Sequence, residues 1–219
     1  RPADALVGLF LDSHPVLKDR RICLYLSRLH PKKAPDLLLR AWRDLESTWR
    51  QSDPPVSLVL IGPCGSTEYL EHLQGLAGEA DHSTDPGPGP SGEIRFLPPV
   101  QGDLKWGALV AADIMALPSH QENFGMVVAE SLAMSTPVLV SREVQTYEEV
   151  EAERGGIVVD DNRESIRDGL TQWAQWTPGE TDMFRQRAHA TYARHFHIDA
   201  AADRLEARLR QAVGNAKGL

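Results

Sequence analysis

Short apolar runs alternate with stretches of helical periodicity along this chain, and that alternation restricts the fold more than any other feature. Six runs have the length and composition of strands, at residues 21–27, 56–61, 94–97, 113–117, 138–140 and 156–160. Helices are predicted near residues 35–50, 67–80, 103–111, 163–176, 181–195 and 199–212, with another that contains Glu130 and stops at residues 135–137. Such alternation predicts an α/β fold, in which a parallel sheet of about six strands carries helices on both faces.

Two segments do not fit this alternation. The first twenty residues fit no element well, so we expect a linker or the remnant of a missing upstream domain at 1–20. Residues 82–92 are crowded with Pro and Gly and predict an exposed loop. The chain starts at Arg1 rather than Met, which we interpret as a fragment or processed product. We expect the sheet domain at 21–177, and closing helices at 178–219 that pack on it or reach toward the missing domain.

Charge and cysteine content exclude several classes of protein. The net charge is −8, so no basic excess is present to neutralise the phosphates of a nucleic acid. The two cysteines give neither a disulfide framework nor the spacing of a metal site. No apolar run is long enough to span a bilayer. We expect a cytoplasmic protein, which in its full-length form could lie against a membrane.

The candidate ligand site lies where the predicted strands end, because ligands of open parallel sheets bind beyond the carboxyl ends of the strands. Arg28, Lys32 and Lys33 follow the first strand and precede a helix, and they would make a phosphate cradle beside its free N–H groups. Taken alone, these cations fit a solvated basic turn better. Gly62 opens a tight turn at 62–65, and the turn's need for small residues explains it as well as a ligand does.

Glu122 and Glu130 are the most informative pair of residues. They are eight residues apart, the first in the loop after the fourth strand and the second in the next helix. A helix over that interval would separate them by roughly 12 Å, about the span from the sugar to the ribose of a sugar nucleotide. Carboxylates accept paired hydrogen bonds and therefore suit vicinal hydroxyls. A surface loop acid and a helix acid are the simpler explanation of any such pair.

The segment between the two acids favours a ligand site. Asn123 can cap the helix, and Gly125 lets a ligand approach the backbone amides at the helix's positive end. In an empty site, both acids would then face a solvent-filled cleft. His120 could orient a ligand or act as a general acid, although a lone loop histidine is more often surface. The sequence has no Gly-x-Gly-x-x-Gly after its first strand, no P-loop and no nucleophile elbow.

Together these segments resemble the carboxyl-terminal half of a family 4 (group 1) glycosyltransferase with the GT-B fold, over roughly residues 20–175. The most specific part is the Glu-x7-Glu signature from Glu122 to Glu130, with residues 123–125 and 135–137 in the expected places. The second part is Ser27-Arg28-Leu29 with Lys33-Ala34, which resembles the family's Gly-Arg-Leu and Lys-Gly pair. The resemblance implies a Rossmann-like domain that binds a nucleotide sugar.

The resemblance also implies roles for individual residues. Arg28 and Lys33 would hold the donor's diphosphate, Glu122 would contact the transferred sugar, and Glu130 would bind the ribose hydroxyls. The full set of implied donor contacts is Arg28, Lys33, Gly62, Glu122, Asn123, Phe124, Gly125 and Glu130, with Arg28, Lys33 and Glu122 as the catalytic residues. The implied enzyme is a retaining, hexosyltransferase-like glycosyltransferase that uses a nucleoside diphosphate sugar, with no metal in this site and no other cofactor. Its sugar or glycoconjugate acceptor would bind a missing amino-terminal domain, so we expect the fragment to bind the donor without efficient transfer.

The chain departs from the family pattern in several places. Ser27, Ala34 and Ser135 stand where glycine is usual, and the loop at 141–149 lacks the family's glycines before its acid. Two alternatives therefore stay open: a non-catalytic nucleotide-sugar binding module that has lost transfer, and a GT-B-fold sugar-nucleotide epimerase. The sequence does not specify the donor sugar, the base, the acceptor or the oligomeric state.

Overall fold

The computed structural model describes residues 2–78 and 89–199, together with residues 202, 206 and 210. Its strands are β1 (Arg21–Leu26), β2 (Val56–Ile61), β3 (Glu93–Leu97), β4 (Ile114–Leu117), β5 (Val138–Ser141) and β6 (Gly156–Val159). They form one six-stranded sheet in the order β3-β2-β1-β4-β5-β6, with each strand parallel to its neighbours. The predicted α/β fold with a parallel sheet is confirmed.

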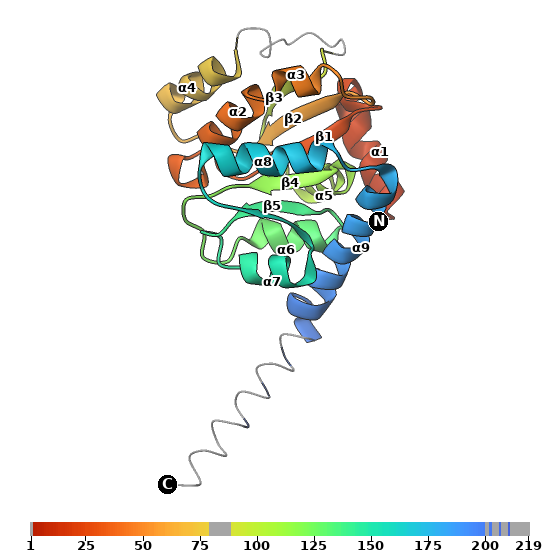
Figure 1. The fold of residues 1–219 in the computed structure, drawn as a ribbon. Helices are drawn as coiled ribbons and strands as arrows, with labels where there is room; N and C mark the ends of the chain where they lie inside the picture. Colours follow the sequence, from red (N-terminus) through yellow and green to blue (C-terminus); the bar gives the residue numbers. More distant parts are fainter. Residues whose placement is uncertain (1, 79–88, 200–201, 203–205, 207–209, 211–219) are drawn as a thin grey trace.

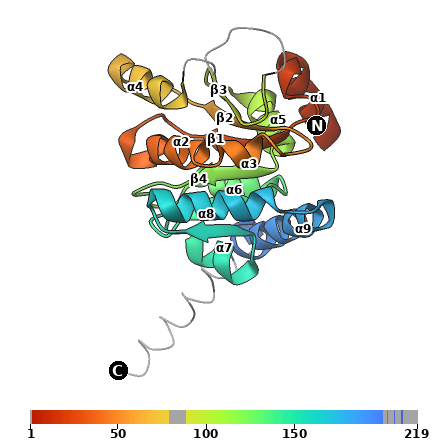
Figure 2. The same ribbon diagram turned by 45° about the horizontal axis from the view of Figure 1, so that its top comes forward.

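Helices cover both faces of this sheet (Figure 1, Figure 2). They are α1 (Ala3–Ser13), α2 (Pro35–Arg43), α3 (Glu46–Trp49), α4 (Thr67–Ala77), α5 (Gly102–Ala111), α6 (Met126–Ala133), α7 (Tyr147–Glu153), α8 (Arg163–Ala174) and α9 (Pro178–His195), with short 3₁₀ helices η1 (Pro15–Leu17) and η2 (Pro31–Lys33). Successive strand residues point to opposite faces. In β1, Cys23 and Tyr25 join the core under α2, α3, α4 and α8, whereas Ile22 and Leu24 join the core under α1, α5, α6 and α9.

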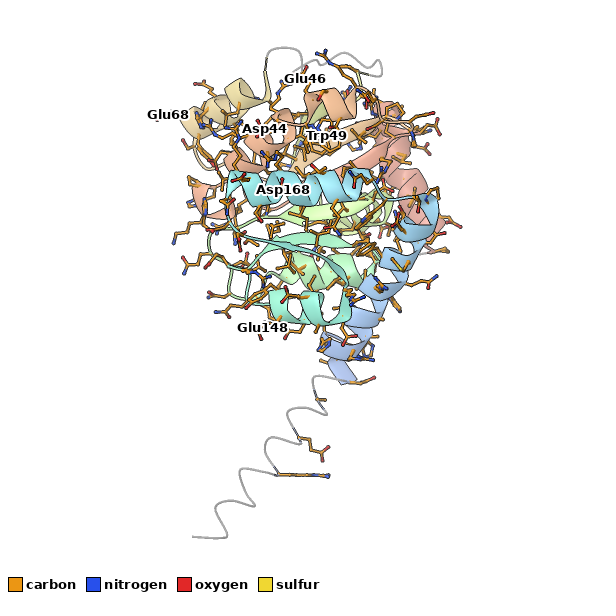
Figure 3. The ribbon with its side chains drawn as sticks, viewed as in Figure 1. Asp44, Glu46, Trp49, Glu68, Glu148 and Asp168 are labelled. Carbon is orange, nitrogen blue, oxygen red and sulfur yellow. The ribbon has the colours of Figure 1, made fainter. Side chains whose placement is uncertain are left out.

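Three tryptophans organise the first of these faces. The rings of Trp42 and Trp49 stack with their centroids 4.3 Å apart, and Trp173 of α8 lies 6.2 and 6.1 Å from them. Trp49, labelled on α3 in Figure 3, donates its indole N–H to the carbonyl of Trp42 at 2.9 Å. Between the two tryptophans, Leu45 leaves the helical conformation with φ −104 and ψ 15. The prediction of one helix over residues 35–50 is therefore wrong, because that segment forms α2 and α3.

The expectation that the first twenty residues fit no element is also wrong. They form α1 and η1, and the side chains of Leu6, Phe10 and Leu17 are buried against the rest of the domain. A Cβ atom at Gly107 of α5 would lie 2.3 Å from the carbonyl oxygen of Leu6, so the close approach of α1 to α5 depends on that glycine. The proposed domain boundaries at residues 20 and 177 stay predictions.

The closing part of the chain packs outside the sheet, as expected. α9 begins at Pro178, where Thr177 and Glu180 form a capping box, and it packs on α6 and α7. The short helix α7 was not predicted. Residues 79–88 and most of 200–219, which include most of the predicted loop at 82–92 and helix at 199–212, lie outside the described residues. Among the described helices, none is both long and apolar enough to cross a membrane.

Candidate functional site

Four loops are tied together at the carboxyl edge of the sheet, on the left of Figure 1. The loops after β1 and β2 are joined by a parallel bridge between Leu29 and Cys64, and those after β4 and β5 by a bridge between Glu122 and Val144. The backbone N–H of His120 donates to the carbonyl of Lys32 at 3.0 Å, which links the two halves of this edge. Figure 3 labels Glu68 and Glu148 in the first turns of α4 and α7, the helices that follow β2 and β5. The edge therefore brings together the loops in which the sequence analysis found candidate residues.

The loop after β1 presents Arg28 to solvent. Arg28 is exposed, and its guanidinium has no hydrogen-bond or ion-pair partner among the described residues. Its carbonyl accepts a 2.9 Å hydrogen bond from the hydroxyl of Tyr25. Burial raises the pKa of Tyr25 well above its ordinary value, so the phenol remains a neutral donor. This bond anchors the backbone of the loop while leaving the arginine side chain available.

Gly62 is explained by packing between two strand ends. A Cβ atom at this position would lie 1.8 Å from the carbonyl oxygen of Ser27. No side chain fits at that distance, so the close approach of the β1 and β2 ends accounts for Gly62 without a ligand.

Lys33 and Glu122 form an ion pair with each other. They come from η2 and from the loop after β4, and their side chains are only 12% and 21% exposed. The backbone of Glu122 is held on both sides, since its N–H donates to the carbonyl of Glu143 and its carbonyl accepts from the N–H of Gln145, each at 3.0 Å. The expected diphosphate-binding cation and sugar-binding acid are therefore direct neighbours.

The amino end of α6 is built differently from the prediction. Gly125 is the N-cap residue, with a left-handed φ of 67, and no side chain caps the helix. Asn123 is exposed and does not cap, so that prediction is wrong. The reason is that Gly125 turns the chain into the helix by itself, in a conformation that other residues rarely adopt. The first N–H groups of α6 are thus left without a side-chain acceptor, as an incoming anion would require.

Glu130 also has a lysine partner. Lys105 of α5 donates to Glu130 at 2.6 Å, and the two side chains are 28% and 22% exposed. The ammonium of Lys105 lies 4.7 Å from the ring centroid of Trp106. Each acid is therefore paired with a cation, and the expectation that both face a solvent-filled cleft stays a prediction. Sequence reasoning missed Lys105 because it belongs to no motif and lies 25 positions from Glu130.

A second residue that sequence reasoning missed, an acid, stands at the edge of the site. Asp161, in the loop after β6, lies 3.0 Å from Nδ1 of His120. Both side chains are partly exposed, at 43% for the histidine and 39% for the aspartate. The pair ties the loop after β6 to the loop that carries Glu122. Among the described residues, no group of three or more His, Cys, Asp or Glu side chains could hold a metal ion.

Two hollows in the described part of the chain lie away from this edge. A cavity of about 400 Å³ near the amino ends of β1 and β2 is lined mainly by polar residues, including Arg21, Thr48 and Gln175. An apolar one of about 410 Å³ lies between α1, α5, α6 and α9. Neither contains the paired acids, so the candidate site is defined by its loops and ion pairs at an open edge.

Comparison with known proteins identifies the family. The family model for glycosyl transferases group 1 matches residues 10–190. This chain belongs to the group 1 glycosyltransferases. The D-inositol 3-phosphate glycosyltransferase of Nocardioides sp. is 35% identical over 179 residues, which cover 79% of this chain and 37% of that protein. The chain spans about two fifths of the length of such curated relatives.

Solved structures agree on the fold. A glycosyltransferase from Rickettsia africae ESF-5 superposes with a TM-score of 0.75 at 15% identity, covering 98% of this chain and 53% of that one. Anabaena HepE, solved in complex with UDP and glucose, gives a TM-score of 0.72 at 18% identity, with 94% and 52% coverage. Identities this low show the fold alone. This group 1 glycosyltransferase chain has the fold of one half of a GT-B enzyme, as the resemblance implied.

Proposed function

We propose that this chain is the donor-binding half of a retaining glycosyltransferase, which transfers a sugar from a nucleoside diphosphate sugar to an acceptor. One observation carries the proposal: Glu122 stands beside a lysine where the loops after β4 and β5 meet, and Glu130, in the helix α6 that follows the loop of Glu122, stands beside another lysine. An edge with both cations and acids can bind a ligand that has both phosphates and hydroxyls. Membership of the family supports sugar transfer. The two lysine–glutamate pairs support a nucleoside diphosphate sugar as the donor.

The chemistry of transfer explains why such a site needs both signs of charge. Breaking a glycosyl–phosphate bond builds positive charge on the sugar and negative charge on the departing diphosphate. Arg28, Lys33 and the uncapped amides of α6 would stabilise the diphosphate, taking the part that a metal ion plays elsewhere. Glu122 would accept hydrogen bonds from the transferred sugar, and Glu130 from the ribose hydroxyls.

The replacement of family glycines in this chain does not favour the alternative of a binding module without transferase activity. Ala34 and Ser135 keep left-handed backbone conformations, with φ values of 50 and 61, so the chain path does not depend on glycine there. The relatives are named D-inositol 3-phosphate glycosyltransferases, but the acceptor of this protein would be bound largely by the part that the chain does not span. A sugar-nucleotide epimerase would share the donor contacts and differ in its products.

Calorimetry with UDP, GDP and ADP, followed by saturation-transfer NMR with their sugar derivatives, tests the proposal. Replacing Arg28 and Lys33 together by alanine should weaken binding of the preferred nucleoside diphosphate at least tenfold, about 1.4 kcal/mol. The matched control replaces Lys18 and Arg50 by alanine, because these cations pair with Asp12 and Glu46 on the surface away from the site. No binding by the unmodified chain, or equal losses in both double variants, would contradict the proposal.

A further inference from the structure

The two ion pairs of the candidate site differ in the role of the lysine when a donor binds. Lys33 belongs to the segment proposed to hold the diphosphate, but its ammonium is bound to Glu122. Lys105 belongs to α5, and its partner Glu130 is proposed to bind ribose. Only the first pair joins a group meant for phosphate to a group meant for sugar. That pair cannot keep its full contact while both members serve their ligands.

We infer that the Lys33–Glu122 ion pair is a latch that the donor's diphosphate opens: the phosphates draw Lys33 away from Glu122, and Glu122 becomes free for the sugar of the same donor. The inference rests on the proposed function of the site and concerns its regulation. The latch makes recognition of the sugar conditional on recognition of the diphosphate, since a free sugar has no anion with which to displace Glu122 from Lys33. The site therefore selects intact donors over their separate parts.

The geometry indicates which partner moves further. The backbone of Glu122 is held by hydrogen bonds to the backbone of Glu143 and Gln145, so its carboxylate can move only by turning about its own side-chain bonds. Lys33 is the last residue of a short 3₁₀ helix and carries its charge on a flexible four-carbon side chain. Arg28 is exposed and its guanidinium has no hydrogen-bond or ion-pair partner among the described residues, so it can receive the phosphates first. Capture by Arg28 then brings the phosphates to the lysine that they must draw away.

The latch makes an unusual prediction about a single substitution. Glu122→Gln removes the charge that competes for Lys33, so the variant should bind a free nucleoside diphosphate about three- to tenfold tighter than the unmodified chain. It should not gain as much for the intact sugar nucleotide, because the acid that receives the sugar is lost. The ratio of the two dissociation constants, measured by calorimetry with UDP and UDP-glucose, GDP and GDP-mannose, or ADP and ADP-glucose, reports this change.

Glu68→Gln is the matched control, because Glu68 is an exposed acid in the first turn of α4 whose side chain has no partner among the described residues. It should leave the affinity for nucleoside diphosphate nearly unchanged. An equal gain in this control would show general charge repulsion and overturn the latch. In Glu122→Gln with Lys33→Gln the gain should disappear, since the latch acts through Lys33; a gain that persists would also overturn it.

A measurement on the unmodified chain avoids dependence on the folding of any acid variant. The side-chain amine NMR signal of Lys33, assigned by its loss in Lys33→Gln, should shift on addition of the nucleoside diphosphate and not on addition of the free sugar. If the unmodified chain binds no nucleotide, the proposed function and the latch both fail. If it binds nucleotide while the Lys33 signal stays fixed and Glu122→Gln binds no tighter, the latch alone fails.

Discussion

Two single residues, Ala34 beside the site and Ser135 before the start of β5, show how this chain keeps a family backbone with unusual side chains. Ala34 and Ser135 both have positive φ, at 50 and 61, where family members usually have glycine. The left-handed region costs an L-residue about 1–2 kcal/mol, so these positions store strain. At Ala34 the wholly buried methyl group offsets part of that cost, whereas Ser135 is only partly buried. The sequence identified the two departures, and the structure supplies the physical reason why glycine is usual there.

Ser135→Gly should therefore stabilise the fold by about 0.5–1 kcal/mol, because relief of the left-handed strain exceeds the entropy that glycine gains in the unfolded chain. Ser135→Ala keeps a Cβ atom and should give no such gain. Urea unfolding of the two variants and the unmodified chain measures the difference. Equal stability of the glycine and alanine variants would contradict the argument.

At the scale of elements, the sequence predicts the strands and helices that a local pattern of apolar residues determines. Each strand is a short apolar run that the adjacent residues in the sequence bring to an end. The sequence therefore predicts all six within about a residue of their bounds. The misses have tertiary causes. α1 is recognised only when Leu6 and Phe10 have α5 to pack against, and the break at Leu45 comes together with a hydrogen bond from the indole of Trp49 to the carbonyl of Trp42. Neither contact is visible in propensity or periodicity.

The packing of α1 on α5 can be tested through two glycines of the same chain. A Cβ atom at Gly107 would lie 2.3 Å from the carbonyl oxygen of Leu6, whereas one at Gly75 in α4 would meet nothing within 4 Å. Gly107→Ala should cost about 1–3 kcal/mol of unfolding free energy, since the helices must separate. Gly75→Ala should instead stabilise by about 0.5–1 kcal/mol through helix propensity. Chemical denaturation of both variants measures these changes in unfolding free energy. A Gly107→Ala variant as stable as the unmodified chain would mean that α1 does not pack on α5 as described.

For the molecule as a whole, the sequence predicted which loops meet but not how their charges pair. Strand ends of a parallel sheet share one edge, so Arg28, Lys33 and Glu122 were expected near one another. The partners Lys33 and Glu122 are 89 positions apart, and Lys105 carried no signal at all. Ion pairing across such separations depends on how the loops fold, which the residue types alone do not specify. An acidic chain of net charge −8 thus holds Lys33 and Lys105 against acids at the site.

Thermal unfolding can separate a donor site from an acceptor site in this chain. A ligand at one hundred times its dissociation constant stabilises the folded state by about 2.7 kcal/mol, which for a domain of this size raises the melting temperature by about 5–10 °C. We expect that shift with the preferred nucleoside diphosphate among UDP, GDP and ADP. An inositol phosphate at the same concentration should shift the melting temperature by less than about 1 °C, because it has a phosphate for Arg28 but no ribose for Glu130. The Arg28→Ala, Lys33→Ala double variant should lose most of the nucleotide shift. A comparable shift with inositol phosphate would instead place acceptor contacts in this chain. That result would contradict the proposal that this chain binds the donor and that the acceptor binds largely outside it.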